Sequence, residues 1–324
     1  HLKKLLDDRE KAIAQGYLDN PRIGKGTVIF RDKEYKAEIR LNGDLKDHWN
    51  SKHRMSLRIK LKNGETIMGM NAFSIHKPKA RQHPYDPVFQ SLISDLNILS
   101  IEAKYLDVEF NDRSWGIMNV EEHFSKQYLE KKQRKESLIF RFSDDLFWKN
   151  YSKSSRKKYS PYRLSDSKLF GEVYGSKKAF QNSHYRKVYS YVMNVRTELE
   201  HEYLYSIDEH MKLLFASLIW GDFHTLADAN IKYYFNPYTL ELSPISSDQG
   251  FFSKLDHDWF DQKSQIYPNE SLNQVLRVFN KYDAHKKASV VNEVIKSFDI
   301  VREKFQSYQG LFPLDLQKDI SILE

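Results

Sequence analysis

The sequence predicts an α+β protein in which a strand-rich first half is followed by a mostly helical second half. Short segments before residue 142 alternate apolar and polar residues, whereas apolar residues after residue 206 recur at helical spacing. The chain has 324 residues and is 40% hydrophobic, so it can form a sizeable core. Its length allows either one two-lobed unit or two domains. No apolar run approaches the length that spans a bilayer.

The first half begins with an amphipathic helix and continues with strands. The helix is expected at residues 2–17, and half-buried strands are expected at 27–31, 35–41, 55–62, 103–110, 115–120 and 137–142. Asn63-Gly64 is typical of a tight turn and predicts a further strand at 66–70. Residues 86–96 have helical spacing, with Asp86 placed to cap the helix.

The second half is dominated by helices. A buried helix is expected from Ile207 to Trp220, and two short strands at 231–235 and 240–242 flank Asn236-Pro237. Further helices are expected around 271–282 and 288–308. This organisation predicts a β-rich segment at 1–142, a linker or insertion at 143–205 and a helical segment at 206–324.

The middle segment is strongly basic and rich in tyrosine, above all over residues 149–187. We first interpret it as a flexible, soluble insertion. Its cations could also form an electrostatic docking surface for an acidic substrate, with Arg156, Lys157 and Lys158 at its centre. Basic residues interleaved with aromatic ones can bind nucleic acid. We consider that partner the less favoured one.

Three polar residues stand out in the second half, namely Asp222, Asn230 and Asp248. Asp248 lies two positions before Gly250. One carboxylate could accept a proton from a hydroxyl group, while the other carboxylate and the carboxamide could bind a hard cation such as Mg²⁺. Protein kinases carry their catalytic base and two metal ligands in this order. Asp and Asn are also ordinary turn residues, so the spacing alone favours a polar loop.

Other segments favour the chemical interpretation. In order along the chain they are Ile39-Arg-Leu-Asn-Gly43, Met55-Ser-Leu-Arg-Ile-Lys-Leu61, Met70-Asn-Ala-Phe73, the run at 110–124 and the region 222–250. Together they resemble the spore-coat-protein-H (CotH) kinases, a divergent branch of the protein-kinase-like fold. The resemblance covers residues 39–250, but not 143–205. It implies a two-lobed atypical protein-kinase-like fold with a β-rich N-terminal lobe and a mostly helical C-terminal lobe.

The resemblance also implies roles for these residues. Asp222 would be the catalytic base, with Asp228 as the alternative, and Asn230 and Asp248 would bind Mg²⁺ or Mn²⁺. The chain would then transfer phosphate from ATP to a Ser/Thr-type hydroxyl of a protein, or to a hydroxyl of a polysaccharide. The acceptor could be acidic, given the basic middle segment.

The residues that would bind ATP are less clearly marked. Glu122 follows Gly116 at the place where the family carries a glutamate, and it would orient a phosphate-binding cation. Met55 stands where the family's lysine is expected. The alternation of the strand groups Arg54, Arg58 and Lys60 on one face, and we favour Arg58 for the phosphate contact, with Arg54 second.

A second function stays open. The chain could be a catalytically weak pseudokinase or assembly protein that binds an anionic partner through residues 149–187. The sequence has no cysteine and leaves the redox compartment open. It begins at His1, as a trimmed chain or a mature form would, and we expect a bacterial-type protein that is secreted, periplasmic or at the cell surface rather than cytoplasmic.

Overall fold

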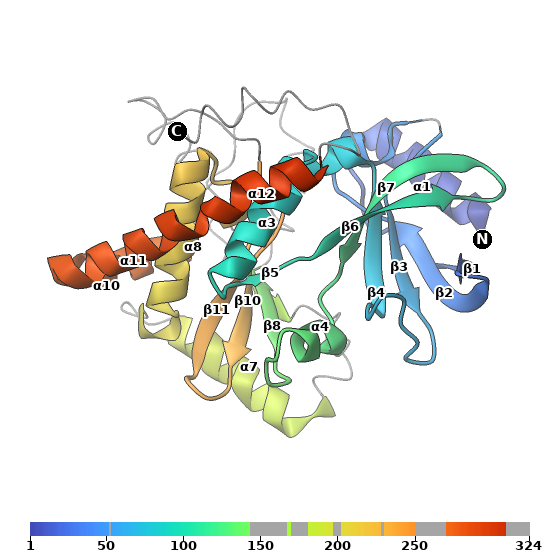
Figure 1. Ribbon diagram of the computed structural model, residues 1–324. Helices are drawn as coiled ribbons and strands as arrows, with labels where there is room; N and C mark the ends of the chain where they lie inside the picture. Colours follow the sequence, from blue (N-terminus) through green and yellow to red (C-terminus); the bar gives the residue numbers. More distant parts are fainter. Residues whose placement is uncertain are drawn as a thin grey trace. The chain divides into compact units, whose positions relative to one another are not determined.

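The computed structural model describes residues 1–51, 53–142, 167–169, 181–196, 202–227, 230–250 and 270–308. It is a mixed α+β structure with a curled antiparallel sheet and a helical part, which confirms the predicted class (Figure 1). The described residues divide into two compact units. Unit 1 holds residues 1–83 and 102–136, and unit 2 holds residues 84–101, 137–142 and everything described from 167 onward. Residues 84–101 therefore separate from the β-rich segment in which they lie along the sequence.

Unit 1 is built on a six-stranded sheet. Its strands are β1 (Gly24–Phe30), β2 (Lys33–Leu41), β3 (Leu57–Leu61), β4 (Ala72–His76), β6 (Ala103–Glu109) and β7 (Ser114–Glu122). The order is β1-β2-β3-β4-β7-β6, and all neighbours are antiparallel. Its helices are α1 (Leu2–Gln15), α2 (Lys46–Trp49), the 3-10 turn η1 (Pro78–Arg81) and α4 (Lys126–Lys131).

The two faces of this sheet differ sharply. Leu57, Ile59 and Leu61 of β3 are buried in an apolar core, which confirms the predicted alternation. Helix α1 adds Leu5 to the same core. Arg58 and Lys60 of β3 lie on the opposite face, where Arg58 is paired with Arg40 and Ser74 in the strand register.

In unit 1 one predicted strand is wrong, and β4 was missed. Asn63 and Gly64 do form a left-handed turn, with φ of 58° and 70°. The chain does not return to the sheet at once, because Ile67 and Met70 bond to each other in a second tight turn, at 2.9 and 3.0 Å between backbone N and O. Pairing with β3 begins only at Ala72, so β4 replaces the expected strand at 66–70.

Unit 2 has a five-stranded sheet of order β5-β11-β10-β8-β9, in which only β5 and β11 are parallel. The strands are β5 (Leu99–Ser100), β8 (Ile139–Phe142), β9 (Ser167–Leu169), β10 (Lys232–Asn236) and β11 (Glu241–Ser246). The helices are α3 (Tyr85–Asp95), α7 (Ser183–Arg196), η2 (Glu202–Leu204), α8 (Ile207–Trp220), η3 (His224–Leu226), α10 (Glu270–Asn280), α11 (Ala284–Ser297) and α12 (Asp299–Tyr308). No helix of the described ranges is long and apolar enough to cross a membrane.

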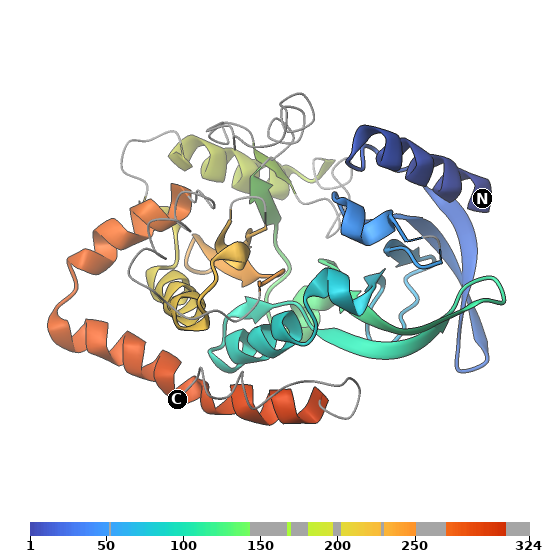
Figure 2. The same cartoon turned by 90° about the horizontal axis from the view of Figure 1, so that it is seen from above.

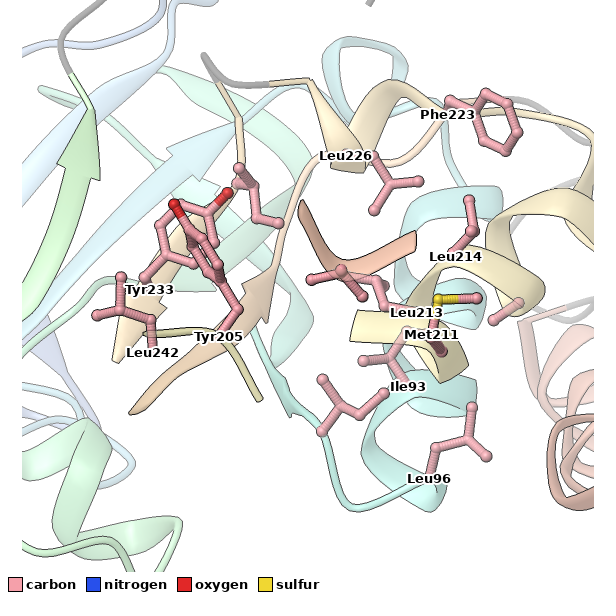
Figure 3. Close-up of a cluster of buried hydrophobic side chains, with 14 of the residues drawn as sticks. Ile93, Leu96, Tyr205, Met211, Leu213, Leu214, Phe223, Leu226, Tyr233 and Leu242 are labelled. Carbon is pink, nitrogen blue, oxygen red and sulfur yellow. The ribbon is translucent and has the colours of Figure 1, made fainter. Parts of the chain in front are cut away.

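Helix α8 forms the centre of the unit 2 core. Figure 3 shows Met211 and Leu213 of α8 near Ile93 and Leu96, close to the C-terminal end of α3. Helices α10 and α11 also pack on α8, and α12 packs along α3, as the view in Figure 2 shows. Unit 2 thus encloses α8 among helices and sheet, and this holds the end of α8 in a fixed place.

Three details of the helices differ from expectation. Asp86 does not cap α3, because the cap position is Pro84 and Asp86 lies buried in the first turn. The helix expected at 288–308 is two helices, since α11 begins earlier, capped by Asp283, and ends before α12. Helix α7 lies inside the segment interpreted as an insertion, yet it buries three valines in the core of unit 2, namely Val188, Val192 and Val195.

Candidate functional site

Asp222 is positioned by the C-terminal end of α8. The helix ends at Trp220, and Gly221 has a left-handed conformation with φ of 76°, which a glycine adopts without a steric cost. The backbone N–H groups of Gly221 and Asp222 still bond to the last turn, at 3.0 Å to Leu218 O and 3.2 Å to Ser217 O. Trp220 is fully buried and anchors this end. Asp222 is 7% exposed, so its carboxylate is held at the edge of the core.

His224 links the three polar residues singled out in the sequence. Its backbone N–H donates to Asp222 Oδ1 at 2.7 Å, and its carbonyl accepts from Asn230 Nδ2 at 2.9 Å. Its ring Nε2 lies 3.8 Å from Asp248 Oδ2. Asp222, Asn230 and Asp248 therefore gather around one residue, although 26 positions separate the first from the last in the sequence numbering.

The loop after β11 lies directly against the end of α8. Trp220 Nε1 donates to Gly250 O at 3.0 Å, and Gln249 Nε2 donates to Asp222 O at 2.9 Å. Gln249 is fully buried. These bonds connect the segment that carries Asp248 to the segment that carries Asp222.

Sequence reasoning missed Lys232, which belongs to the same site. Its Nζ donates to Asn230 O and lies 3.3 Å from Ser247 Oγ, while Ser247 Oγ also donates to Asn230 O at 3.2 Å. Lys232 thus brings a positive charge beside Asn230, which is expected to bind the cation. Lys232 could have been found from the sequence, because it lies two residues after Asn230 at the start of the hairpin.

The oxygen groups suit a hard cation better than a soft one. Asn230 uses its amide nitrogen to bond His224, which leaves the carboxamide oxygen as the group to offer to a cation. The side chain of Asp248 is 30% exposed and can be reached from solvent. Within the described ranges, no group of three or more His, Cys, Asp or Glu residues could hold a metal ion by itself. One carboxylate and one carboxamide would need phosphate oxygens to complete the coordination of Mg²⁺.

Arg58 lies in a polar row across the sheet of unit 1. The register places Arg40, Arg58, Ser74 and Glu121 opposite one another on successive strands. Arg58 Nε donates to Ser74 Oγ at 2.7 Å, and Nη2 is 3.4 Å from Asn42 Oδ1. The guanidinium group is therefore held over the polar face.

The other two cation candidates are placed differently. Arg54 Nη1 donates to Trp115 O at 3.0 Å, and Trp115 belongs to the apolar core. Lys60 is exposed near the end of β3. Of the three candidates, Arg58 is the one whose guanidinium group bonds to two side chains, those of Ser74 and Asn42.

Glu122 and Glu121 face opposite sides of β7, as strand geometry requires. Glu121 bonds to Arg81, with 2.5 Å between Oε2 and Nε. Glu122 is 1% exposed, and its ion-pair partner among the described residues is Lys131, at 3.2 Å. Burial raises the pKa of Glu122, against the attraction of Lys131. Glu122 thus pairs with a lysine of α4, whereas the sequence suggested that it positions Arg58 or a nearby phosphate-binding cation.

Asp228, the alternative base, and the docking residues Arg156, Lys157 and Lys158 lie outside the described residues.

The fold and this site define a mixed α+β protein with an oxygen-rich polar site at the end of a buried helix. No protein-family model matches the sequence, and a comparison with curated proteins finds no match.

Proposed function

We propose that this chain is an atypical, CotH-like kinase that transfers phosphate from ATP to a hydroxyl group with the help of Mg²⁺ or Mn²⁺. The observation that carries the proposal is the convergence of Asp222, Asn230 and Asp248 around His224. A proton acceptor and two oxygen ligands in one small site are what phosphoryl transfer requires of a protein, since catalysis rests mainly on positioning and charge neutralisation.

In the proposed reaction Asp222 accepts the proton of the acceptor hydroxyl group. The oxygen of that group forms a bond to the γ-phosphorus atom, and the bond from this phosphorus to the β–γ bridging oxygen breaks, so ADP leaves. The backbone N–H of His224 fixes Asp222 Oδ1, and the buried end of α8 holds the backbone. Such a fixed carboxylate loses little orientation entropy when the acceptor binds.

Asn230 and Asp248 are the residues we assign to the cation, which would neutralise charge on the phosphates of the nucleotide. Lys232 adds a fixed positive charge beside them. In unit 1 we assign Arg58 to the phosphates, ahead of Arg54 and Lys60, because it is held by two side chains. Glu122 supports this unit through Lys131.

The acceptor is proposed to be a Ser/Thr-type hydroxyl of a protein or a polysaccharide hydroxyl, acidic in character if residues 149–187 take part in docking. We keep the expectation of a secreted, periplasmic or cell-surface location for this function.

One observation favours the second candidate, a catalytically weak pseudokinase that binds an anionic partner. Glu122 is paired with Lys131, whereas active kinases use a carboxylate of the first lobe to orient the phosphate-binding cation. A protein that binds nucleotide without transferring phosphate would follow if Glu122 does not orient the phosphate-binding cation.

The test is transfer of label from γ-labelled ATP in the presence of Mg²⁺ or Mn²⁺, with a Ser-rich acidic protein or an acidic polysaccharide as acceptor. We expect transfer by the natural sequence and none by Asp222→Ala or Asp248→Ala. Cation-dependent thermal stabilisation by ATP without transfer would favour the pseudokinase. Absence of both would refute the proposal.

A further inference from the structure

Asp86 and Gln249 connect helix α3 to the loop that carries Asp248. The backbone N–H of Gln249 donates to Asp86 Oδ1 at 2.9 Å across 163 positions of sequence. Asp86 is 4% exposed and Gln249 is fully buried. The same Asp86 oxygen accepts from Gln90 Nε2 at 2.9 Å, one turn further along α3. A buried carboxylate is costly unless hydrogen bonds satisfy it, so these bonds fix the place of the loop against α3.

The side chain of Gln249 binds the other half of the site. Its Nε2 donates to Asp222 O at 2.9 Å, and its Oε1 accepts from the backbone N–H of Thr225 at 3.2 Å and of Gly250 at 3.0 Å. One buried carboxamide thus connects the backbone on both sides of His224 to the backbone beyond Asp248.

Asp248 lies in a strained conformation between two fixed neighbours. Its φ is 61°, in the left-handed region that non-glycine residues adopt only at a steric cost. The N–H of Ser247, before it, donates to Thr225 Oγ1 at 3.2 Å, and the N–H of Gln249, after it, donates to Asp86. The bonds on both sides hold Asp248 in this conformation, which directs its carboxylate toward His224.

We propose that Asp86 and Gln249 are positioning residues for the cation site: Asp86 holds the backbone after Asp248, and Gln249 fixes the spacing between the Asp248 and Asp222 loops. The inference rests on the proposed function, because it assigns Asp248 to a cation. Neither residue needs to touch the cation in this role. Residues behind metal ligands commonly set metal affinity by orienting those ligands.

The test compares variants that keep or remove one bond. Asp86→Asn keeps an oxygen at the position that accepts from Gln249, whereas Asp86→Ala removes it. Gln249→Leu removes the three side-chain bonds at similar size. Gln90→Leu is the matched control, since it also removes a buried glutamine and a bond to Asp86 but leaves the Gln249 bonds in place.

Two measurements are made on each variant. Hydrogen exchange of the 246–250 amides is followed without metal or nucleotide, and Mn²⁺ affinity is measured by electron paramagnetic resonance with a non-hydrolysable ATP analogue present, because phosphate oxygens are needed to complete the coordination of the cation. We expect faster exchange and affinity weakened about tenfold to 100-fold for Asp86→Ala and Gln249→Leu. Asp86→Asn and Gln90→Leu should stay near the natural sequence in both.

Three results would overturn the inference. Unchanged exchange and Mn²⁺ affinity in Asp86→Ala would show that the bond positions nothing. Loss of Mn²⁺ binding in Asp86→Asn with unchanged exchange would make Asp86 itself a cation ligand. If the natural sequence binds no Mn²⁺, the proposed cation site is wrong, and Asp86 and Gln249 cannot position it. Faster hydrogen exchange in Asp86→Ala and Gln249→Leu would then show only that these residues stabilise the loop.

Discussion

The carboxylate of Asp222 occupies the space that a side chain at position 250 would need. A Cβ atom built on Gly250 would lie 2.5 Å from Asp222 Cγ and 2.6 and 2.7 Å from its two oxygens. These distances are far below van der Waals contact, so either the loop or the carboxylate would have to move. Gly250 is therefore required by close approach to the candidate base, and no unusual backbone angle is involved.

Gly250→Ala should abolish most transfer activity with a smaller effect on stability. The added methyl group would displace Asp222, and misplacement of a catalytic group by about 1 Å costs about 100-fold in rate. We expect kcat to fall by that order, measured by label transfer. Gly26→Ala is the matched control, because its Cβ would meet only the flexible end of Ile39, at 2.6 Å. Equal loss in both variants would argue against a specific role of the Asp222 contact.

Arg58→Met should raise KM for ATP at least about tenfold, because charge-assisted hydrogen bonds to phosphate contribute about 1.5–3 kcal/mol. The methionine keeps an unbranched side chain but cannot bind phosphate. Lys60→Met is the control, since Lys60 is exposed on the same face of β3. A larger increase in KM in Lys60→Met than in Arg58→Met would contradict the assignment of the phosphate contact to Arg58 and favour Lys60.

Much of the fold followed from sequence periodicity. The alternation around Arg58 predicted a two-faced strand, and the apolar run up to Trp220 predicted a buried helix. The strand at 72–76 was missed although Phe73 to His76 alternate apolar and polar residues, because the Asn63-Gly64 turn favoured an earlier strand at 66–70. Helix α7 was overlooked because its few buried valines are spread among basic and tyrosine residues.

The candidate site was predictable in part. Asp222, Asn230 and Asp248 could be singled out by residue type and by the helix and hairpin around them. The bonds of Asp222 and Asn230 to His224 involve its backbone atoms, which residue type does not reveal. Asp86 was interpreted as a helix cap from its place near the start of the helix. Its bond to Gln249 could not be predicted, because the two positions are too distant for any local sequence pattern. Long-range polar contacts of this kind are set by tertiary structure alone.

Lys131→Met should destabilise unit 1, and a second change should restore it. Without Lys131 the buried carboxylate of Glu122 loses its ion-pair partner, which we expect to cost about 1–3 kcal/mol, because Lys131 is itself 34% exposed. Glu122→Gln should cost less, since burial already raises the pKa of this carboxyl group. In the double variant the loss from Lys131→Met should largely disappear. Urea unfolding of the four proteins measures the coupling, and strictly additive effects would show that the pair is unimportant.

The stability of unit 2 should fall in acid because of His210. Burial lowers the pKa of His210 from 6.5 to about 4, and its Nδ1–H donates to Ser206 O at 2.7 Å. The unfolded chain therefore binds the proton first, and the stabilisation present above pH 6.5 is lost as the pH falls toward 4. At pH 5 this loss is about 2 kcal/mol.

The variant His210→Phe keeps an aromatic ring but cannot titrate. At pH 7 it should be less stable than the natural sequence by about 1 kcal/mol, because it loses the hydrogen bond of His210. At pH 5 this difference in stability should shrink or reverse. Denaturant unfolding at both pH values checks this, with His285→Phe on the exposed side of α11 as the control. A difference that does not change with pH would mean that His210 is not the group that titrates.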